Sequence, residues 1–167
     1  VINNNNITFI NNTLFGGWET NIELVAGSVE IRDSRLLGGA GTKYNLFVRS
    51  NNSKVINSNV SGSSLSDIVM QSYTNLTVLN SNYSNHNNQS NGFIYRQWYV
   101  DVKVKDTAGN NLTNANVSFT NNTGALIISA LTNSSGDITR QNVTEYYVDA
   151  AVKYFQTNYT INATKLG

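Results

Sequence analysis

The stretch Val29-Glu30-Ile31-Arg32-Asp33-Ser34-Arg35-Leu36 has three close counterparts in the first half of the chain, at residues 7–14, 53–60 and 76–83. In each copy an apolar residue and one outward residue precede Asp or Asn, and the chain returns to an apolar residue three positions later. The equivalent Asp and Asn residues are 22, 24 and 23 residues apart. A near-constant period in the low twenties with a short strand in each copy indicates a solenoid. The equivalent residues are Asn11, Asp33, Asn57 and Asn80.

A second set of apolar segments follows the same period. Residues 22–24, 46–48, 68–70 and 93–95 are separated by 24, 22 and 25 residues, and polar or glycine-containing loops at 38–41, 62–64 and 85–90 connect the strands. Because parallel connections within one sheet are right-handed in nearly all proteins, we predict a right-handed parallel β-helix of about four rungs. The equivalent Asn and Asp residues are then expected to stack along the axis and to form amide hydrogen bonds. Asp33 interrupts the amide row and is expected to accept hydrogen bonds from a neighbouring Asn or a backbone N–H.

The pattern changes near Trp98. Val100, Val102 and Val104 alternate with charged residues, and further short apolar segments follow at residues 116–120, 125–131, 138–143, 146–153 and 159–163. Short alternating strands separated by turn-forming residues are typical of an antiparallel β-sandwich. We therefore predict an all-β chain with a β-helix over residues 1–98 and a sandwich over residues 99–167. Trp98 is expected to close the end of the solenoid.

Residues 100–117, VDVKVKDTAGNNLTNANV, resemble the opening of the carboxypeptidase-regulatory-like, immunoglobulin-type domains, V-x-V-x-D-x-x-G-x-P-L-x-x-A-x-V, with Asn111 in place of the proline. Residues 132–136 and 147–152 resemble the later T-D-x-x-G and Y-x-V-x-V elements of that family. The first half of the chain resembles the NosD-type β-helices of archaeal surface proteins. Together these resemblances imply a cell-surface scaffold or adhesive module, and they transfer no catalytic residue.

Asparagine is unusually frequent, with 29 residues beside 33 Ser or Thr. The chain contains 14 N-x-[ST] sequons, where random placement would give about six. Turn chemistry accounts for Asn59 and Asn82 beside the repeated bend, because Asn, Ser and Thr side chains bond to local backbone. It does not account for sequons outside the repeat, so we interpret them as N-glycosylation sites of an extracellular chain. The acceptors are Asn6, Asn11, Asn51, Asn59, Asn75, Asn82, Asn88, Asn111, Asn116, Asn121, Asn133, Asn142, Asn158 and Asn162.

Composition excludes several classes of function. Eleven Lys and Arg against ten Asp and Glu give no basic field for nucleic acid. No apolar run approaches the roughly 20 residues that a membrane span requires. The chain has no cysteine, so disulfides, zinc-ribbon sites and thiol chemistry are absent.

The candidate catalytic and metal-binding residues have alternative interpretations. A glycosidase needs two carboxylates across a cleft, but the acidic group of the solenoid lies among Arg32 and Arg35 and is expected to form an exposed ion-paired face. His86 has no second metal ligand nearby, so neither copper nor zinc is expected. The tyrosines of the second half of the chain provide either a sugar-stacking platform or one face of the sandwich. The aspartates of the same half lack the EF-hand spacing of a calcium site. The acidic group is Glu19, Glu23, Glu30 and Asp33, the aspartates are Asp101, Asp106 and Asp137, and the tyrosines are Tyr146, Tyr147, Tyr154 and Tyr159.

Our first hypothesis is a secreted, N-glycosylated subunit of a filament or surface layer, without catalysis or cofactor. We expect copies of the chain to assemble head-to-tail, with residues 1–14 of one subunit meeting residues 99–167 of the next, because exposed strand edges pair with other chains. The alternative is a carbohydrate-binding or adhesive module that uses the flat face of the solenoid. An enzyme acting on polysaccharide is the third hypothesis.

Overall fold

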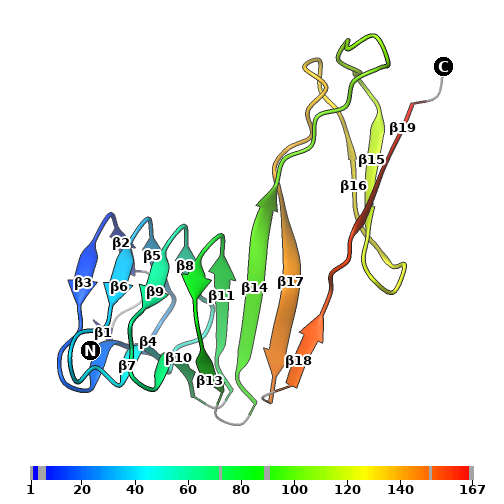
Figure 1. Cartoon of the computed structure of the whole chain (residues 1–167). Helices are drawn as coiled ribbons and strands as arrows, with labels where there is room; N and C mark the ends of the chain where they lie inside the picture. The colour runs from blue at the N-terminus through cyan, green and yellow to red at the C-terminus, as the bar shows by residue number, and fades with distance from the viewer. Residues whose placement is uncertain (1, 4–6, 72, 89–90, 151, 166–167) are drawn as a thin grey trace. The chain divides into compact units, whose positions relative to one another are not determined.

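The computed structural model describes residues 2–3, 7–71, 73–88, 91–150 and 152–165, which form β-strands and turns and no helix (Figure 1). The chain divides into two compact units. The first comprises Val1–Trp98 and Tyr146–Tyr154, and the second comprises Tyr99–Glu145 and Phe155–Gly167. The units therefore differ from the two consecutive ranges expected from the sequence, because Tyr146–Tyr154 returns to the first unit.

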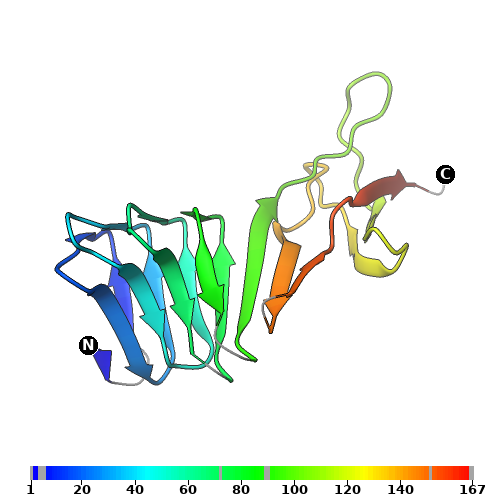
Figure 2. The same ribbon diagram turned by 60° about the horizontal axis from the view of Figure 1, so that its bottom comes forward.

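The first unit is a parallel β-solenoid whose rungs contribute strands to three sheets (Figures 1 and 2). The prediction of an all-β chain with a parallel β-solenoid of about four turns is confirmed. The first sheet has the order β1 (Ile2–Asn3), β4 (Thr20–Ala26), β7 (Tyr44–Val48), β10 (Ser66–Met70) and β13 (His86–Asn88). The second sheet has the order β3 (Thr13–Phe15), β6 (Arg35–Leu37), β9 (Asn59–Ser61) and β12 (Asn82–Tyr83). The third sheet has the order β2 (Ile7–Ile10), β5 (Val29–Arg32), β8 (Ser53–Ile56), β11 (Asn75–Leu79), β14 (Phe93–Val100), β17 (Gln141–Asp149) and β18 (Val152–Phe155).

Strand register follows the apolar period of the sequence. Phe9 pairs with Ile31, Ile31 with Val55 and Val55 with Val78, so one apolar column runs through the rungs. Ile31, Val55 and Val78 are fully buried. Side chains alternate between the faces of a strand, so this register directs every second residue of each rung into the solenoid.

The last rung differs from the prediction. Residues 93–95 were expected to extend the series of β4, β7 and β10, but β14 pairs with β11, and β13 occupies the expected place. The connection before β13 consists of residues 84–85, whereas residues 62–65 connect β9 to β10, so this rung is shorter. His86–Asn88, expected in a loop, is therefore a strand paired with Ile68–Met70. Residues 89–90 of that expected loop lie outside the described residues.

The solenoid sheet continues beyond the last rung with β17 and β18, and β17 runs antiparallel to β14 (Figure 1). Tyr146 and Val148 of β17 are buried within the solenoid core, whereas Trp98 is half-buried. Separate strands at residues 138–143 and 146–153 were expected, and this prediction is wrong. Residues 141–149 form one strand that neighbours β14, and the break comes at Ala150, whose φ is 44°.

The second unit contains the antiparallel sheet β16 (Leu126–Leu131), β15 (Asn116–Thr120) and β19 (Thr160–Thr164). Val117 and Phe119 of the central strand are fully buried. The strand expected around Val102 and Val104 is reduced to isolated bridges, Lys103 with Asp137 and Lys105 with Asn111. The immunoglobulin-type sandwich stays a prediction. None of the described residues belongs to a helix long and apolar enough to cross a membrane.

Candidate functional site

The bend after each strand of the β2–β5–β8–β11 series explains the repeated Asn or Asp. Asn11, Asp33, Asn57 and Asn80 have φ values of 56°, 52°, 49° and 47°. Apart from glycine, Asn and Asp adopt this left-handed conformation most readily, because their short polar side chains bond locally. Their backbone N–H groups continue the hydrogen bonding between rungs. Asn or Asp therefore recurs in the sequence because each bend of the solenoid requires a residue that adopts positive φ.

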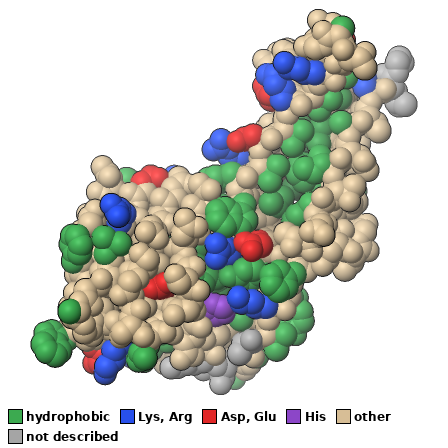
Figure 3. Space-filling model, in the orientation of Figure 1, with side chains coloured by type: hydrophobic (Ala, Val, Ile, Leu, Met, Phe, Trp, Pro, Cys, Tyr) green, Lys and Arg blue, Asp and Glu red, His purple; other side chains and the backbone are tan. Residues whose placement is uncertain are grey.

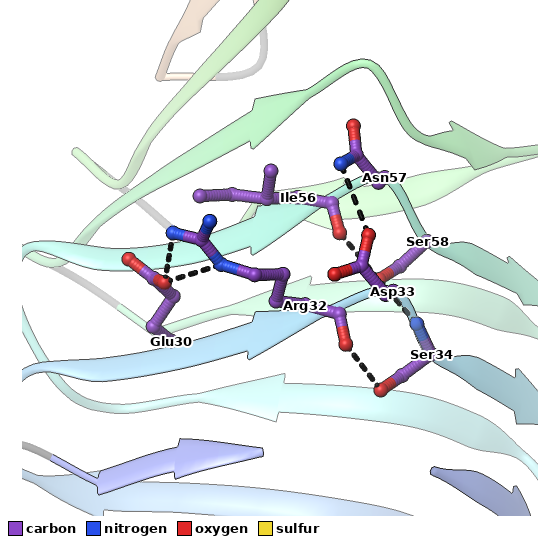
Figure 4. A network of polar contacts seen from close by, with 7 residues as sticks. All are labelled: Glu30, Arg32, Asp33, Ser34, Ile56, Asn57 and Ser58. Carbon is purple, nitrogen blue, oxygen red and sulfur yellow. Dashed lines mark hydrogen bonds and ion pairs between the residues drawn. The ribbon is translucent and has the colours of Figure 1, made fainter. Parts of the chain in front are cut away.

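The side chains at these bends form a hydrogen-bonded row. Nδ2 of Asn80 donates to Oδ1 of Asn57 at 2.9 Å. Nδ2 of Asn57 in turn donates to Oδ1 of Asp33 at 3.0 Å (Figure 4). Among the described residues, no side-chain hydrogen bond joins Asn11 to Asp33. Asp33 is thus the acceptor at the end of a row that begins at Asn80.

A buried serine follows the bend and forms a second row, which the sequence interpretation described only as a small polar position. The hydroxyl of Ser58 accepts the N–H of Ser34 at 3.0 Å and donates to the carbonyl of Ile56 at 2.7 Å (Figure 4). Ser34 and Ser81 make equivalent bonds in the adjoining rungs. Each hydroxyl satisfies one donor and one acceptor where the strand pairing is interrupted. Together the two rows line a shallow polar groove of about 620 Å³, which also contains the acceptors Asn59 and Asn82.

The acceptor asparagines share one property in the structure, which is that none of the described ones is buried. Asn45 is the fully buried asparagine of the described chain, and it does not belong to a sequon. Asn6 lies outside the described residues. The exposed acceptors are Asn11, Asn51, Asn82, Asn111, Asn116, Asn133, Asn142, Asn158 and Asn162, and the half-buried ones are Asn59, Asn75, Asn88 and Asn121.

Hydrogen bonding distinguishes these acceptors further. N-glycans are attached at Nδ2, and Nδ2 donates within the protein at Asn59, Asn88 and Asn121. At another four acceptors only Oδ1 is bonded, which leaves Nδ2 without a partner among the described residues. These four are Asn51, Asn75, Asn116 and Asn133.

A buried polar cluster that the sequence analysis did not identify lies at the start of β7 and β10. Asp67 is 2% exposed and accepts from Nδ2 of Asn45 at 3.2 Å, the hydroxyl of Ser63 at 2.8 Å and the N–H of Ser84 at 2.8 Å. Oδ1 of Asn45 is buried without a hydrogen-bond partner. Each of these donors belongs to a different strand or loop, so the cluster fixes the corner between two sheets. Its signal in the sequence is the row Asn21, Asn45 and Asp67 at the solenoid period.

Arg96 occupies the last position of the apolar column, opposite Val78. Its guanidinium lies 5.0 Å from the ring centre of Tyr83, 5.1 Å from that of Trp98 and 6.0 Å from that of Tyr146. The hydroxyls of Tyr83 and Tyr146 are hydrogen-bonded at 2.7 Å. Burial, followed by this hydrogen bond, raises the pKa of Tyr83 well above its usual value. Tyr83 and Tyr146 belong to the solenoid core, and Arg96 and Trp98 lie half-buried beside them, where cation–π contacts are stronger than at exposed sites.

The carboxylates considered for catalysis are paired separately. Glu30 pairs with Arg32, Glu23 with Arg49 at 2.7 Å and Glu19 with Lys43 at 3.1 Å. Asp33 belongs to the amide row. No group of three or more His, Asp or Glu residues gathers within the described part of the chain. The acidic group therefore does not converge on one cleft.

The aspartates considered for calcium also have separate partners. Arg140 donates two hydrogen bonds to Asp101, at 2.9 and 2.8 Å, and these lower the pKa of that carboxyl. Hydrogen bonds from Asn110, then from Ala108 and Gly109, lower the pKa of Asp106. Asp137 lies 3.4 Å from Lys103.

The tyrosines considered for sugar stacking do not form one group. Tyr147 stacks on Tyr154 with ring centres 4.9 Å apart, and Tyr95 lies 6.1 Å from Tyr147, all on the first unit. Tyr146 is in the solenoid core. Tyr159 belongs to the second unit, where its hydroxyl donates to the carbonyl of Thr144 at 2.9 Å.

The visible surface consists mostly of uncharged polar side chains and backbone, with isolated charges (Figure 3). In comparisons with known proteins, no family model, curated protein or solved structure matches this chain.

Proposed function

We propose that this chain is a non-catalytic, N-glycosylated structural protein of an extracellular surface layer or filament. The observation that supports the proposal is the placement of the acceptor asparagines. All 13 described acceptors reach the surface in both units, whereas the fully buried Asn45 is not an acceptor. An asparagine excess that served only the solenoid bends would not extend to exposed strand and turn positions of the second unit.

The resemblances found in the sequence belong to the same proposal. The solenoid is taken as a NosD-type β-helix of archaeal surface proteins, and the second unit as an immunoglobulin-type, carboxypeptidase-regulatory-like sandwich. In this proposal the three-stranded sheet β16–β15–β19, whose Val117 and Phe119 are buried, is one of the two layers of the sandwich. The separate pairing of the acidic residues agrees with a scaffold without catalysis.

Intact mass of the protein purified from its native cells tests glycosylation. We expect a mass well above the 18.3 kDa of the polypeptide, with glycopeptides from both units. A native species at the polypeptide mass would overturn the proposal. The matched control is the same chain made in a host without N-glycosylation.

We further propose that subunits assemble head-to-tail through the first rung. Ile10, Phe15 and Trp18 are 57, 75 and 89% exposed, and Phe9 and Leu14 are only half-buried against the core. Rows of apolar side chains at a strand edge favour pairing with another chain. A neighbour's residues 99–167 are the proposed partner of residues 1–14 and of the exposed side chains of Phe15 and Trp18 that follow them.

Negative-stain microscopy of native material tests the assembly. Fibres or sheets that dissociate after Trp18→Ser and Phe15→Ser together support the proposal, and Lys54→Ser is the surface control. A native monomer, or native chains in which further rungs of the same polypeptide cover Phe9 and Leu14, would contradict it.

A carbohydrate-binding module is the second candidate, and one observation favours it. A groove on the solenoid combines the rings of Tyr73 and Phe93 with several amides and Asp149. Aromatic rings with a few polar groups are the usual composition of small-ligand sites. Saturable binding of a soluble glycan by a monomer would favour this candidate over the structural one.

A further inference from the structure

The groove on the solenoid contains two of the acceptor asparagines. Its volume is about 570 Å³, and all of its lining residues belong to the first unit. Its lining includes two aromatic residues, Tyr73 and Phe93, together with amides and a carboxylate. The remaining lining residues are Asn51, Asn52, Thr74, Asn75, Asn91 and Asp149.

Asn75 is held with its amide nitrogen available. Its Oδ1 accepts the backbone N–H of Asn52, and its own N–H donates to Oδ1 of Asn51 at 3.1 Å. Nδ2 of Asn75 donates no hydrogen bond within the described chain. The carbonyl side of the amide is therefore fixed to the neighbouring rung, while the atom that receives a glycan is not used by the fold.

Tyr73 precedes Asn75 by two residues and has an unusual conformation. Its φ is 62°, and the residue is 76% exposed. The backbone is held there because the N–H of Tyr73 donates to Asn91 and the hydroxyl of Thr74 donates to the carbonyl of Gln71 at 2.6 Å. A bulky residue in left-handed conformation is strained and persists only where its surroundings fix it. The ring itself makes no aromatic contact among the described residues.

We infer that the first sugar attached to Asn75 lies in this groove and stacks its apolar C–H face on the ring of Tyr73. The inference rests on the proposed glycosylation of the chain and assigns Tyr73 as a positioning residue for that glycan. The aromatic face offers an apolar surface of suitable size. The sugar hydroxyls exchange water for the amides and carboxylate of the groove walls. The glycan thus covers an aromatic residue that is otherwise exposed.

The glycan and the ring are tested together in a double-mutant cycle made in the native host. Tyr73→Leu removes the ring but keeps an apolar side chain at the same left-handed position. Thr77→Ala removes the sequon of Asn75 while preserving the bonds of Asn75 to the neighbouring rung. Thr77→Ser keeps the sequon and is the matched control. Asn75→Gln provides a second glycan-free variant if Thr77→Ala does not fold.

We expect Tyr73→Leu to lower Tm by roughly 2–4 °C more in the glycosylated background than in the Thr77→Ala background. Glycopeptide mass spectrometry of the Asn75 peptide is measured in the same samples. An occupied Asn75 with equal Tm changes in both backgrounds overturns the inference and leaves glycosylation intact. An unoccupied Asn75 beside other occupied sequons also overturns it, and absence of glycan everywhere overturns the proposed function itself.

A free saccharide from solution would offer the groove the same chemistry as the glycan attached to Asn75. Binding of N-acetylglucosamine and of glucose to the Thr77→Ala protein is measured by NMR titration. Chemical-shift changes at Tyr73 that are lost in Tyr73→Leu, without coupling to the Asn75 glycan, would identify the groove as a site for an external saccharide and overturn the tethered form of the inference.

Discussion

At the residue scale, the bends of the solenoid depend on single side chains that tolerate positive φ. Asn57 has a φ of 49°, donates from Nδ2 to Asp33 and accepts from Asn80. Backbone conformation and side-chain bonding therefore select the same residue type. Substitution separates the two contributions, because glycine adopts a positive φ readily but has no side chain to form the hydrogen bonds.

We predict that Asn57→Ala lowers the free energy of unfolding by about 2–3 kcal/mol, from left-handed strain and lost hydrogen bonds. Asn57→Gly should cost about 1 kcal/mol, because only the hydrogen bonds are lost. Chemical denaturation measures both, with Lys54→Ala on the same rung as the control. Equal losses for alanine and glycine would show that φ does not select this residue.

The inward and outward positions of β5 allow a sharper comparison. We predict that Ile31→Asp, or Val55→Asp in the next rung, unfolds the solenoid, because each places an unpaired charge at a fully buried site at a cost of several kcal/mol. Glu30→Ala should change stability by less than about 1 kcal/mol, since its ion pair with Arg32 is partly exposed. Circular dichroism during thermal unfolding distinguishes them. Similar melting of all three variants would contradict the register.

His86 makes the stability of the protein depend on pH. Burial, and after it the charge of Lys153, lowers the pKa of His86 below its usual 6.5. The unfolded chain binds a proton as the pH falls through 6.5, whereas the folded chain does so only at lower pH. The contribution of His86 to stability is therefore complete above pH 6.5 and decreases below it. Tm measured from pH 8 to pH 5 should fall less in His86→Gln than in the natural protein, and parallel curves would contradict this prediction.

At the element scale, β17 completes a core built by segments far earlier in the chain. Tyr146 bonds to Tyr83, which lies 63 positions earlier in the sequence, and Val148 is fully buried. The solenoid needs this layer because each rung depends on a neighbour to cover its apolar cross-section. The ring of Tyr146 also contacts Arg96, so one strand provides both apolar and cation–π contacts.

We predict that Tyr146→Ala lowers the free energy of unfolding of the first unit by about 3–5 kcal/mol, as for other large buried aromatic truncations. Tyr154→Ala on the neighbouring strand should cost about 1 kcal/mol or less, because its side chain is 43% exposed. Hydrogen exchange of β11 and β14 amides measures the local effect. Unchanged protection of these amides in Tyr146→Ala would mean that β17 does not stabilise the solenoid.

At the scale of the whole molecule, the chain has a net charge of only +1, and the face drawn in Figure 3 shows mostly uncharged polar side chains and backbone. Proteins with net charge near zero tend to associate. Exposed apolar side chains on the first rung and on β16, including Leu126 and Leu131, increase that tendency. Glycans on the exposed acceptors would oppose non-specific association by adding hydrated bulk.

We predict that the chain without glycans aggregates at lower concentration than the native glycoprotein. Static light scattering against concentration, at matched ionic strength, measures the difference, and replacing Leu126 and Leu131 by Ser should partly restore the solubility of the unglycosylated chain. Equal solubility of the two forms would show that glycans are not required to keep this surface in solution.

The sequence by itself determined the repeat of the solenoid. Residue spacing fixed the apolar column from Phe9 to Val78, and the recurrent Asn or Asp fixed the bends, because both are properties of consecutive residues in one rung. The strand β15 was also predicted with its observed bounds, Asn116–Thr120. These features require no knowledge of which distant segments pair.

Only the tertiary structure decided how the repeat ends. The short fourth rung, the strand at His86–Asn88 and the return of β17 to the solenoid depend on pairing between distant strands, which residue spacing does not encode. The same holds for the position of Arg96 among aromatic rings and for the burial of Asp67. A buried carboxylate needs hydrogen-bond partners, and Asn45 and Ser84, which donate to Asp67, reach it only once the chain has folded.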